Sequence, residues 1–214
     1  EQSKAVGLRN LNGGIHNLLR AYLPIVSSEQ IVDPPIQVAK THRLALLGAE
    51  SSGKTTLAME LTKALRDLGY NAGMVPEYLR IWCIENGRTP DFTEQEAIIE
   101  GQLALEDAAA TQFAVLVCDP AAITTGFYSL EYFGSDLHLE WDLLERYDQL
   151  FLCDIDFPWR TDPLRDGEIV RTHMHALIVD YLTESAEMLA GNIPLLSGST
   201  SERLAVALAL LNLD

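Results

Sequence analysis

Basic residues are scarce in this sequence. Its 214 residues contain 31 aspartates and glutamates against 15 lysines and arginines, which gives a formal net charge of -16 at pH 7. Such a chain repels polyanions on average, so the composition argues against a general nucleic-acid binder. A protein of this composition can still bind one small anion, because backbone amides and a few directed cations are enough to hold it. Basic residues that gather in particular loops therefore become informative.

Long apolar runs and paired cysteines are also missing. No stretch approaches the roughly 20 consecutive apolar residues that a membrane-spanning helix requires. The first residues, EQSKAVGLRN, lack the apolar centre of a signal peptide. Cys83, Cys118 and Cys153 form no CxxC pair, which argues against a zinc site and a disulfide framework. We therefore expect a soluble protein of the reducing cytoplasm, with neither membrane nor nucleic acid as a partner.

A polar stretch with two prolines, SSEQIVDPPIQ, separates the beginning of the chain from the remainder. The leading segment contains HNLLRAYLPIV, which suits a short helix but is too small to build a core alone. We therefore predict an N-terminal appendage or linker over residues 1–40. One domain is predicted over residues 41–214, a length that buries enough apolar surface to fold by itself.

Beyond this boundary, short apolar runs alternate with segments of helical periodicity. The runs LALLGA, GMVPEY, FAVLVCD, QLFLCDID and NIPLLSG read as strands, and Pro76 weakens the second. A stripe of leucines at helical spacing follows the first run: Leu57, Leu61, Leu65 and Leu68. The alternation predicts an α/β fold, in which a parallel five-stranded sheet carries helices on both faces and binds ligands at the carboxyl ends of its strands.

Two capping boxes locate further helices. Thr93 with Glu96 is predicted to cap the helix EAIIEGQLALEDAAA, and Ser199 with Glu202 to cap the last helix. A further helical region is expected over residues 121–147.

The string GAESSGKTT lies between the first predicted strand and the first helix and matches the pattern GxxxxGK[ST]. The pattern predicts a phosphate-binding loop, whose curled backbone points successive N–H groups at phosphate oxygens. Lys54 is expected to reach the β- and γ-phosphates, and the Thr55 hydroxyl to ligate magnesium. We therefore predict a site for ATP and Mg²⁺ formed by Gly48, Glu50, Ser51, Ser52, Gly53, Lys54, Thr55 and Thr56.

Charged residues also follow the second and third predicted strands. Asp119 ends the third strand, where a carboxylate can hold the magnesium water shell or accept a proton from an acceptor hydroxyl. Glu77 and Arg80 end the second, spaced to face one cleft, where they can accept from hydroxyls and bind an anion. The structural alternatives are a helix cap for Asp119 and a surface ion pair for the other two.

The polar segment FPWRTDPLRDGE follows the fourth predicted strand and reads as a mobile loop. Arg160 and Arg165 within it suit a lid that closes on a triphosphate and neutralises charge on the transferred group, although solvated positions are the alternative. Trp159 beside them can stack on a ring or anchor the loop.

Three aromatic residues, Tyr128, Tyr132 and Phe133, follow Asp119 in the chain. They can form the wall of an acceptor pocket, although aromatic residues in such places more often belong to the core. The five histidines show no metal-ligand spacing, and we assign them no chemistry.

Four segments occur in a fixed order: GAESSGKTTL, PEYLR, CDPAAITT and FPWRTDPLR. Together they resemble the ribosylnicotinamide kinase domain of the NadR proteins, one of the NadR-like P-loop kinases, whose corresponding segments read GGESSGKST, WEYxR, DTDxxxTT and PWxxDGxR. The resemblance covers residues 42–172. It implies ATP-dependent phosphorylation of the 5′ hydroxyl of nicotinamide riboside, on a sheet like that of nucleoside and nucleotide kinases. HNLLRAYLP also resembles the linker that joins this kinase to an adenylyltransferase domain.

Carried over position by position, the resemblance marks eight site residues: Lys54, Thr55, Glu77, Arg80, Asp119, Trp159, Asp162 and Arg165. With the motifs above, four are predicted to be catalytic: Lys54, Asp119, Glu77 and Arg165. The acceptor is predicted to contact Glu77, Arg80, Asp119, Tyr128, Trp159 and Asp162. Thr55 and Asp119 are predicted to hold the metal.

Two positions depart from the family pattern. Pro76 stands where an aromatic residue usually precedes the glutamate, and Ala121 stands where the third segment has a second acid. These departures favour an alternative, a kinase for another nucleoside or small hydroxyl compound. A second alternative is a regulatory module that binds or hydrolyses ATP to control a partner.

Overall fold

The computed structural model describes residues 40–136, 138–140, 142–159, 167–184 and 193–213. They contain a five-stranded sheet of order β2-β3-β1-β4-β5, in which all neighbouring strands are parallel. Its strands are β1 (His42–Leu47), β2 (Ala72–Val75), β3 (Val115–Cys118), β4 (Gln149–Cys153) and β5 (Leu195–Leu196). The predicted parallel α/β sheet is confirmed. The predicted appendage lies outside the described residues except for Lys40.

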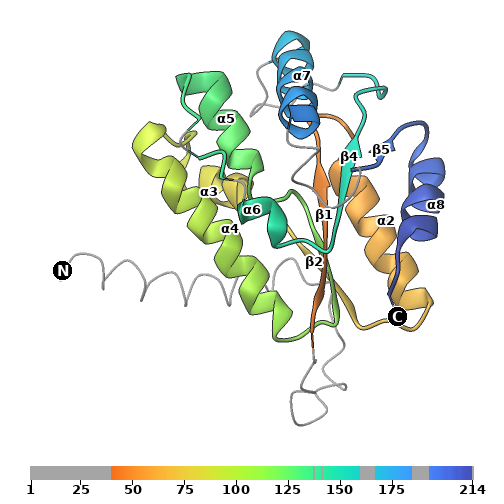
Figure 1. Ribbon diagram of the computed structural model, residues 1–214. Coiled ribbons are helices and arrows are strands. Elements are labelled where there is room, and N and C mark those ends of the chain that lie inside the picture. Colours follow the sequence, from red (N-terminus) through yellow and green to blue (C-terminus); the bar gives the residue numbers. More distant parts are fainter. Residues whose placement is uncertain (1–39, 137, 141, 160–166, 185–192, 214) are drawn as a thin grey trace, which may run out of the picture. The chain divides into compact units, whose positions relative to one another are not determined.

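Helices cover both faces of the sheet (Figure 1). The helices are α2 (Lys54–Asp67), α3 (Tyr78–Asn86), α4 (Gln95–Ala110), α5 (Thr124–Phe133), α6 (Asp142–Glu145), α7 (Glu168–Glu184) and α8 (Thr200–Leu210), with a 3-10 turn η1 (Phe92–Glu94). α2 and α8 lie on one side of the sheet, and α3, α4 and α5 lie on the other. Among the described helices, none is long and apolar enough to cross a membrane.

The leucine stripe of α2 packs against the sheet as its spacing predicts, except at its end. Leu57, Leu61 and Leu65 are fully buried in one cluster with Phe151 of β4. Leu68 is 65% exposed, so its place in the stripe is wrong. It is the C-cap of α2, where the backbone leaves the helix and no longer follows the helical face.

The second strand is shorter than the sequence predicts. It ends at Val75, before Pro76, which has no N–H to extend a ladder of hydrogen bonds. Glu77 is therefore the N-cap of α3 and not the last residue of a strand. The carboxylate still lies just beyond the carboxyl end of β2.

The predicted capping box of Thr93 and Glu96 is wrong. Asp91 is the capping residue, and its Oδ1 accepts a hydrogen bond from the Thr93 N–H at 2.9 Å. Glu94 Oε2 accepts from the Asp91 N–H at 2.9 Å and completes the box. A turn of 3-10 helix thus precedes α4, because the aspartate two residues earlier supplies a better placed acceptor.

Two other helix predictions have different outcomes. The box of Ser199 and Glu202 is confirmed at the start of α8. The helical region over residues 121–147 is broken, because Gly134 adopts a left-handed conformation with φ of 64° that ends α5.

Candidate functional site

A cavity of about 850 Å³ lies where the carboxyl ends of the parallel strands meet. Its size suits a small-molecule ligand. Eleven of the predicted site residues line it: Glu50, Ser51, Ser52, Gly53, Lys54, Thr55, Thr56, Glu77, Arg80, Asp119 and Tyr128. Gly48 belongs to the same loop, while the half-buried Trp159 is not part of this lining. The predicted lid residues Arg160, Asp162 and Arg165 lie outside the described residues.

The loop between β1 and α2 curls through three residues with positive φ. These are Gly48 at 142°, Ser51 at 53° and Gly53 at 83°. Gly53 is the N-cap of α2, and no side chain caps this helix end. The first amides of a helix have no partner within the helix and carry the positive end of its dipole. This geometry is suited to an anion with several oxygens, such as a polyphosphate.

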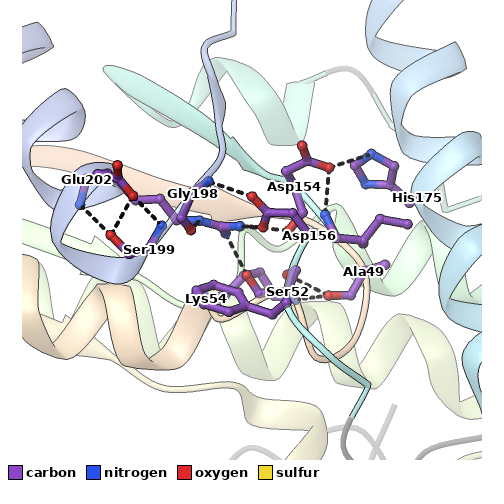
Figure 2. A network of polar contacts seen from close by, with 12 residues as sticks. Ala49, Ser52, Lys54, Asp154, Asp156, His175, Gly198, Ser199 and Glu202 are labelled. Carbon is purple, nitrogen blue, oxygen red and sulfur yellow. Dashed lines mark hydrogen bonds and ion pairs between the residues drawn. The ribbon is translucent and has the colours of Figure 1, made fainter.

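Lys54 lies across the mouth of this loop. Its Nζ donates hydrogen bonds to the carbonyl oxygens of Gly48 and Ala49, both at 2.7 Å. The Ser52 hydroxyl donates to the same Ala49 carbonyl at 2.7 Å, and Figure 2 shows these contacts around Ala49. An ammonium has three donors, and neutral carbonyls are weaker partners than phosphate oxygens. The side chain is therefore placed to transfer its bonds to an incoming phosphate.

Gly48→Ala is expected to destabilise the fold and weaken ATP binding. A Cβ at this position would lie 2.8 Å from the Cys153 carbonyl oxygen and 2.9 Å from Ser52 Oγ, at a φ that side chains rarely adopt. Strain and overlap together are expected to cost about 2 to 3 kcal/mol in the free energy of unfolding by urea titration. Gly69→Ala is the control, since its φ is also positive but no atom lies within 4 Å of the added carbon. Equal losses in the two variants would contradict the close packing at Gly48.

Asp119 follows β3 and is only 3% exposed. Burial raises the pKa of its carboxyl, while the positive charge of Lys54, a hydrogen bond with the Thr55 side chain and the charge of Arg80 lower it. Among the described atoms, Asp119 Oδ1 is buried without a hydrogen-bond partner. A buried carboxylate oxygen in that state points to a ligand, because its desolvation is otherwise uncompensated.

Thr55 and Asp119 together fit the predicted Mg²⁺ site. The hydroxyl and the carboxylate are hard oxygen donors joined by a hydrogen bond, and Mg²⁺ commonly takes one or two such protein ligands together with water and phosphate oxygens. In the part of the chain that the structure describes, no group of three or more histidines, cysteines, aspartates and glutamates is placed to hold a metal.

The same cavity extends from the loop to residues of α3 and α5, and we call this part of it the second compartment. Glu77 and Arg80 lie on its α3 side, with Glu77 Oε2 at 3.8 Å from Arg80 Nε. They are therefore both an ion pair and part of the cavity lining. Their predicted contact with an acceptor remains a proposal.

Aromatic rings line the α5 side of this compartment. Tyr128 and Tyr132 stack with ring centroids 6.0 Å apart, and the Tyr128 hydroxyl donates to Glu50 Oε1 of the loop at 3.5 Å. Tyr132 and Phe133 are 43% and 42% exposed and also line the cavity. The expectation that they belong to the core is wrong for these two, because the last turn of α5 turns them toward the cavity.

Arg203 is a site-supporting residue that the sequence did not reveal. It lies on α8 with 1% of its surface exposed. Its Nη1 donates to the Ser52 carbonyl at 2.7 Å, its Nε to the Gly198 carbonyl at 3.0 Å, and its Nη2 to the Asp154 carbonyl at 3.2 Å. Asp156 pairs with the same guanidinium. Figure 2 shows how these partners converge from the loop, the end of β4 and the start of α8.

The contact with Ser52 fixes the orientation of a loop peptide. In a trans peptide the carbonyl and the following N–H point in opposite directions, so the bond from Arg203 turns the Gly53 N–H away from α8. The Phe157 ring lies 4.4 Å from the guanidinium carbon, and a Cβ at Gly53 would lie 2.7 Å from this ring. The sequence contains one signal for the burial of Arg203: it lies one turn after Ser199 and on the same face of α8 as the buried Ala207.

A buried carboxyl supports the segment that follows Asp119. Glu106 of α4 is fully buried, and its Oε1 accepts a hydrogen bond from the Tyr147 hydroxyl at 2.8 Å. That hydroxyl accepts from the Ala122 N–H at 2.8 Å. Burial raises the pKa of Glu106 to about 7, although the bond from Tyr147 and the charge of Arg146 act in the opposite direction.

Glu106→Gln is expected to remove a pH-dependent loss of stability. In the unfolded chain the carboxyl titrates near 4.5, so between this pH and about 7 only the folded state holds the proton. The free energy of unfolding therefore falls as pH rises through this window, by about 1.4 kcal/mol per pH unit. Relative to the wild type, the variant is expected to gain about 2 kcal/mol between about pH 5.5 and pH 8 in urea titrations. A constant difference at both pH values would contradict the raised pKa.

Comparison with known proteins places this site in a family. The model of the AAA domain family matches residues 43–203. No curated protein matches the chain.

Solved structures with the same fold include kinases. The chain is similar to thymidylate kinase from Ehrlichia chaffeensis, with 16% identity and a TM-score of 0.58 over 80% of this chain and 100% of that chain. It is also similar to a NadR protein in complex with NAD and AMP-PNP, with 19% identity and a TM-score of 0.57 over 80% and 49% of the two chains. Its similarity to a NadR protein in complex with NR amounts to 20% identity and a TM-score of 0.53, over 76% of this chain and 47% of that chain. The chain thus spans about half of the NadR chains and has the fold of P-loop nucleoside and nucleotide kinases.

Proposed function

The chain belongs to the AAA domain family, and on this premise we propose that it is an ATP- and Mg²⁺-dependent kinase of a small molecule. The observation that carries the proposal is the position of Asp119. This buried carboxylate lines the same cavity as the loop that is suited to a polyphosphate and as Glu77 and Arg80. A site for ATP alone needs no second compartment, whereas a kinase needs one for its acceptor.

The chain's own residues supply positioning and charge. The loop amides and Lys54 hold the phosphates of ATP, and Thr55 with Asp119 would hold Mg²⁺, which neutralises negative charge on the β- and γ-phosphates when bound. The acceptor hydroxyl oxygen forms a bond to the γ-phosphorus while the bond from this phosphorus to the β–γ bridging oxygen breaks, and ADP leaves. Asp119 or Glu77 accepts the hydroxyl proton.

We propose nicotinamide riboside as the acceptor. The resemblance of four segments to the NadR kinase domain supports this choice, as does the fold shared with the NadR structures. The charge of the cavity supports it too, since carboxylates outnumber cations in the lining and the nicotinamide ring of the riboside is positively charged. Tyr132 and Phe133 offer aromatic surface to such a ring.

The alternative acceptor, another nucleoside or small hydroxyl compound, is favoured by Pro76 and Ala121. Neither residue is part of the cavity lining, and Ala121 is fully buried with its N–H bonded to the Leu46 carbonyl at 3.1 Å. The two departures from the family pattern therefore lie outside the wall of the acceptor compartment, which other residues form.

The proposal is tested by incubating the protein with ATP, Mg²⁺ and nicotinamide riboside, in parallel with common nucleosides, and measuring the mass gain of one phosphoryl group. Nicotinamide mononucleotide is the expected product. Asp119→Asn is expected to lower the rate by about 10²- to 10⁴-fold, because it removes a metal ligand or base. Phosphorylation of a different nucleoside would support the alternative acceptor. Bound ATP without a phosphorylated product would support a regulatory module and contradict the kinase.

A further inference from the structure

Gln95 is a buried side chain that the proposed reaction does not yet use. It is the first residue of α4, lines the cavity and is 3% exposed. Its Nε2 donates to the Asp91 carbonyl at 3.3 Å. Among the atoms of the described residues, its Oε1 finds no hydrogen-bond partner although it is buried.

The orientation of this amide follows from its neighbour. The Asp91 carbonyl can only accept a hydrogen bond, so the NH₂ group of Gln95 must face it, and the opposite orientation would bring two oxygens together. The amide oxygen is left as a fixed acceptor in the cavity wall. A buried acceptor without a partner is unfavourable, and in a cavity wall it points to a donor on a ligand.

The position of Gln95 on α4 indicates which part of the acceptor it faces. Two turns further along α4, the Gln102 Oε1 accepts from the Tyr78 N–H at 2.8 Å, beside the end of β2. The two glutamines are seven positions apart on the α-helix, which corresponds to about 10 Å along its axis. The acceptor hydroxyl has to lie at the sheet end, near Lys54 and Asp119. Gln95 therefore faces the part of the acceptor that is remote from this hydroxyl.

The surroundings of Gln95 favour a flat group that donates hydrogen bonds. Phe133 lines the same cavity, and its ring lies 5.7 Å from that of Phe92 in η1. Asp91, which also lines the cavity, adds a negative charge to this part of its wall. A carboxylate or ring carbonyl at this place would meet an acceptor and a negative charge, whereas an amide or amino N–H would be paired.

We propose that Gln95 determines acceptor specificity by accepting a hydrogen bond from an amide or amino group on the ring of the acceptor. The inference rests on the proposed kinase function and narrows its substrate class to nucleosides whose base carries an exocyclic amide or amino donor. It predicts that nicotinamide riboside is preferred over nicotinic acid riboside, and cytidine over uridine. Within each pair, only one member has an exocyclic N–H.

The experiment compares kcat/KM for both members of each pair in the wild type and in Gln95→Leu. The wild type is expected to prefer the donor-bearing member by about tenfold or more, and the variant to lose most of this preference through a higher KM for that member. Gln102→Leu is the matched control, because it removes another buried glutamine of α4 and is expected to keep the ratio whatever it does to stability. An unchanged ratio in Gln95→Leu would overturn the inference.

A binding measurement separates this inference from the kinase proposal. The rise in unfolding temperature is measured for each compound in the presence of ADP and Mg²⁺. If no compound is phosphorylated but donor-bearing compounds stabilise the wild type and not Gln95→Leu, the kinase proposal fails and the role of Gln95 stands. If product forms and the two members of each pair are used equally, the role of Gln95 fails and the kinase stands. The absence of both product and binding contradicts both.

Discussion

Replacement of Lys54 by alanine is expected to lower the rate of phosphoryl transfer by about 10³-fold, while the domain stays folded. Its Nζ is the cation that crosses the mouth of the loop, bonded at 2.7 Å to the Gly48 and Ala49 carbonyls. In the proposed reaction this charge stabilises the transferred phosphoryl group, so its loss acts on kcat. The side chain is only half-buried, so water can replace it at the two carbonyls. Product formation and thermal unfolding are measured on the same preparation.

Lys63→Ala is the matched control for this prediction. Lys63 lies on the same helix, with a side chain that is 70% exposed and paired to Asp67 at 2.7 Å. Its removal is expected to leave both activity and the free energy of unfolding close to the wild-type values. Full activity of Lys54→Ala would refute the assignment of the loop as the phosphate site.

Arg203→Met is expected to cost about 3 to 5 kcal/mol in the free energy of unfolding and to weaken binding of ATP and Mg²⁺. The buried guanidinium satisfies the carbonyls of Ser52, Asp154 and Gly198 and pairs with Asp156. Methionine fills much of the volume but leaves these acceptors without donors. Because Ser52 belongs to the phosphate loop, the loss is expected to reach nucleotide affinity as well as stability. Urea titration and calorimetry measure the two effects.

Two further variants make this prediction decisive. Arg88→Met removes an exposed arginine whose two nitrogens bind Glu94 at 2.7 Å, and it is expected to destabilise the fold much less than Arg203→Met. Arg203→Lys keeps the charge but cannot donate to acceptors from three segments at once. This variant is expected to remain folded and to bind ATP at least about tenfold more weakly. ATP affinity equal to that of the wild type would contradict the positioning of the Ser52 peptide by Arg203.

The sequence predicted the features that depend on local pattern. The glycine spacing around Lys54 and the apolar run before it indicated a strand, a curled loop and a helix, and β1 and α2 occupy these places. The alternation of runs with helical segments predicted the parallel sheet, whose inner strand β3 is buried throughout. Asp119 was found for the same reason, since the end of an apolar run marks the edge of such a sheet.

The features that the sequence did not predict depend on contacts between distant residues or on competition between neighbours. The bond from Arg203 to Ser52 joins residues 151 positions apart, and no local pattern encodes it. Gln95 becomes informative only when one oxygen is seen buried in a cavity wall. The box at the start of α4 was placed on Thr93 because both Asp91 and Thr93 are good caps, and only the backbone conformation decides between them.

Calorimetric titration of the wild-type protein with ATP in the presence of Mg²⁺ tests the central claim most directly. The geometry of the loop predicts saturable binding at one site, which is weaker in Gly48→Ala and strongly reduced without Mg²⁺. A folded wild-type protein that releases or absorbs no heat of binding with ATP and Mg²⁺ would contradict the account, because every proposed step begins from a polyphosphate held by this loop.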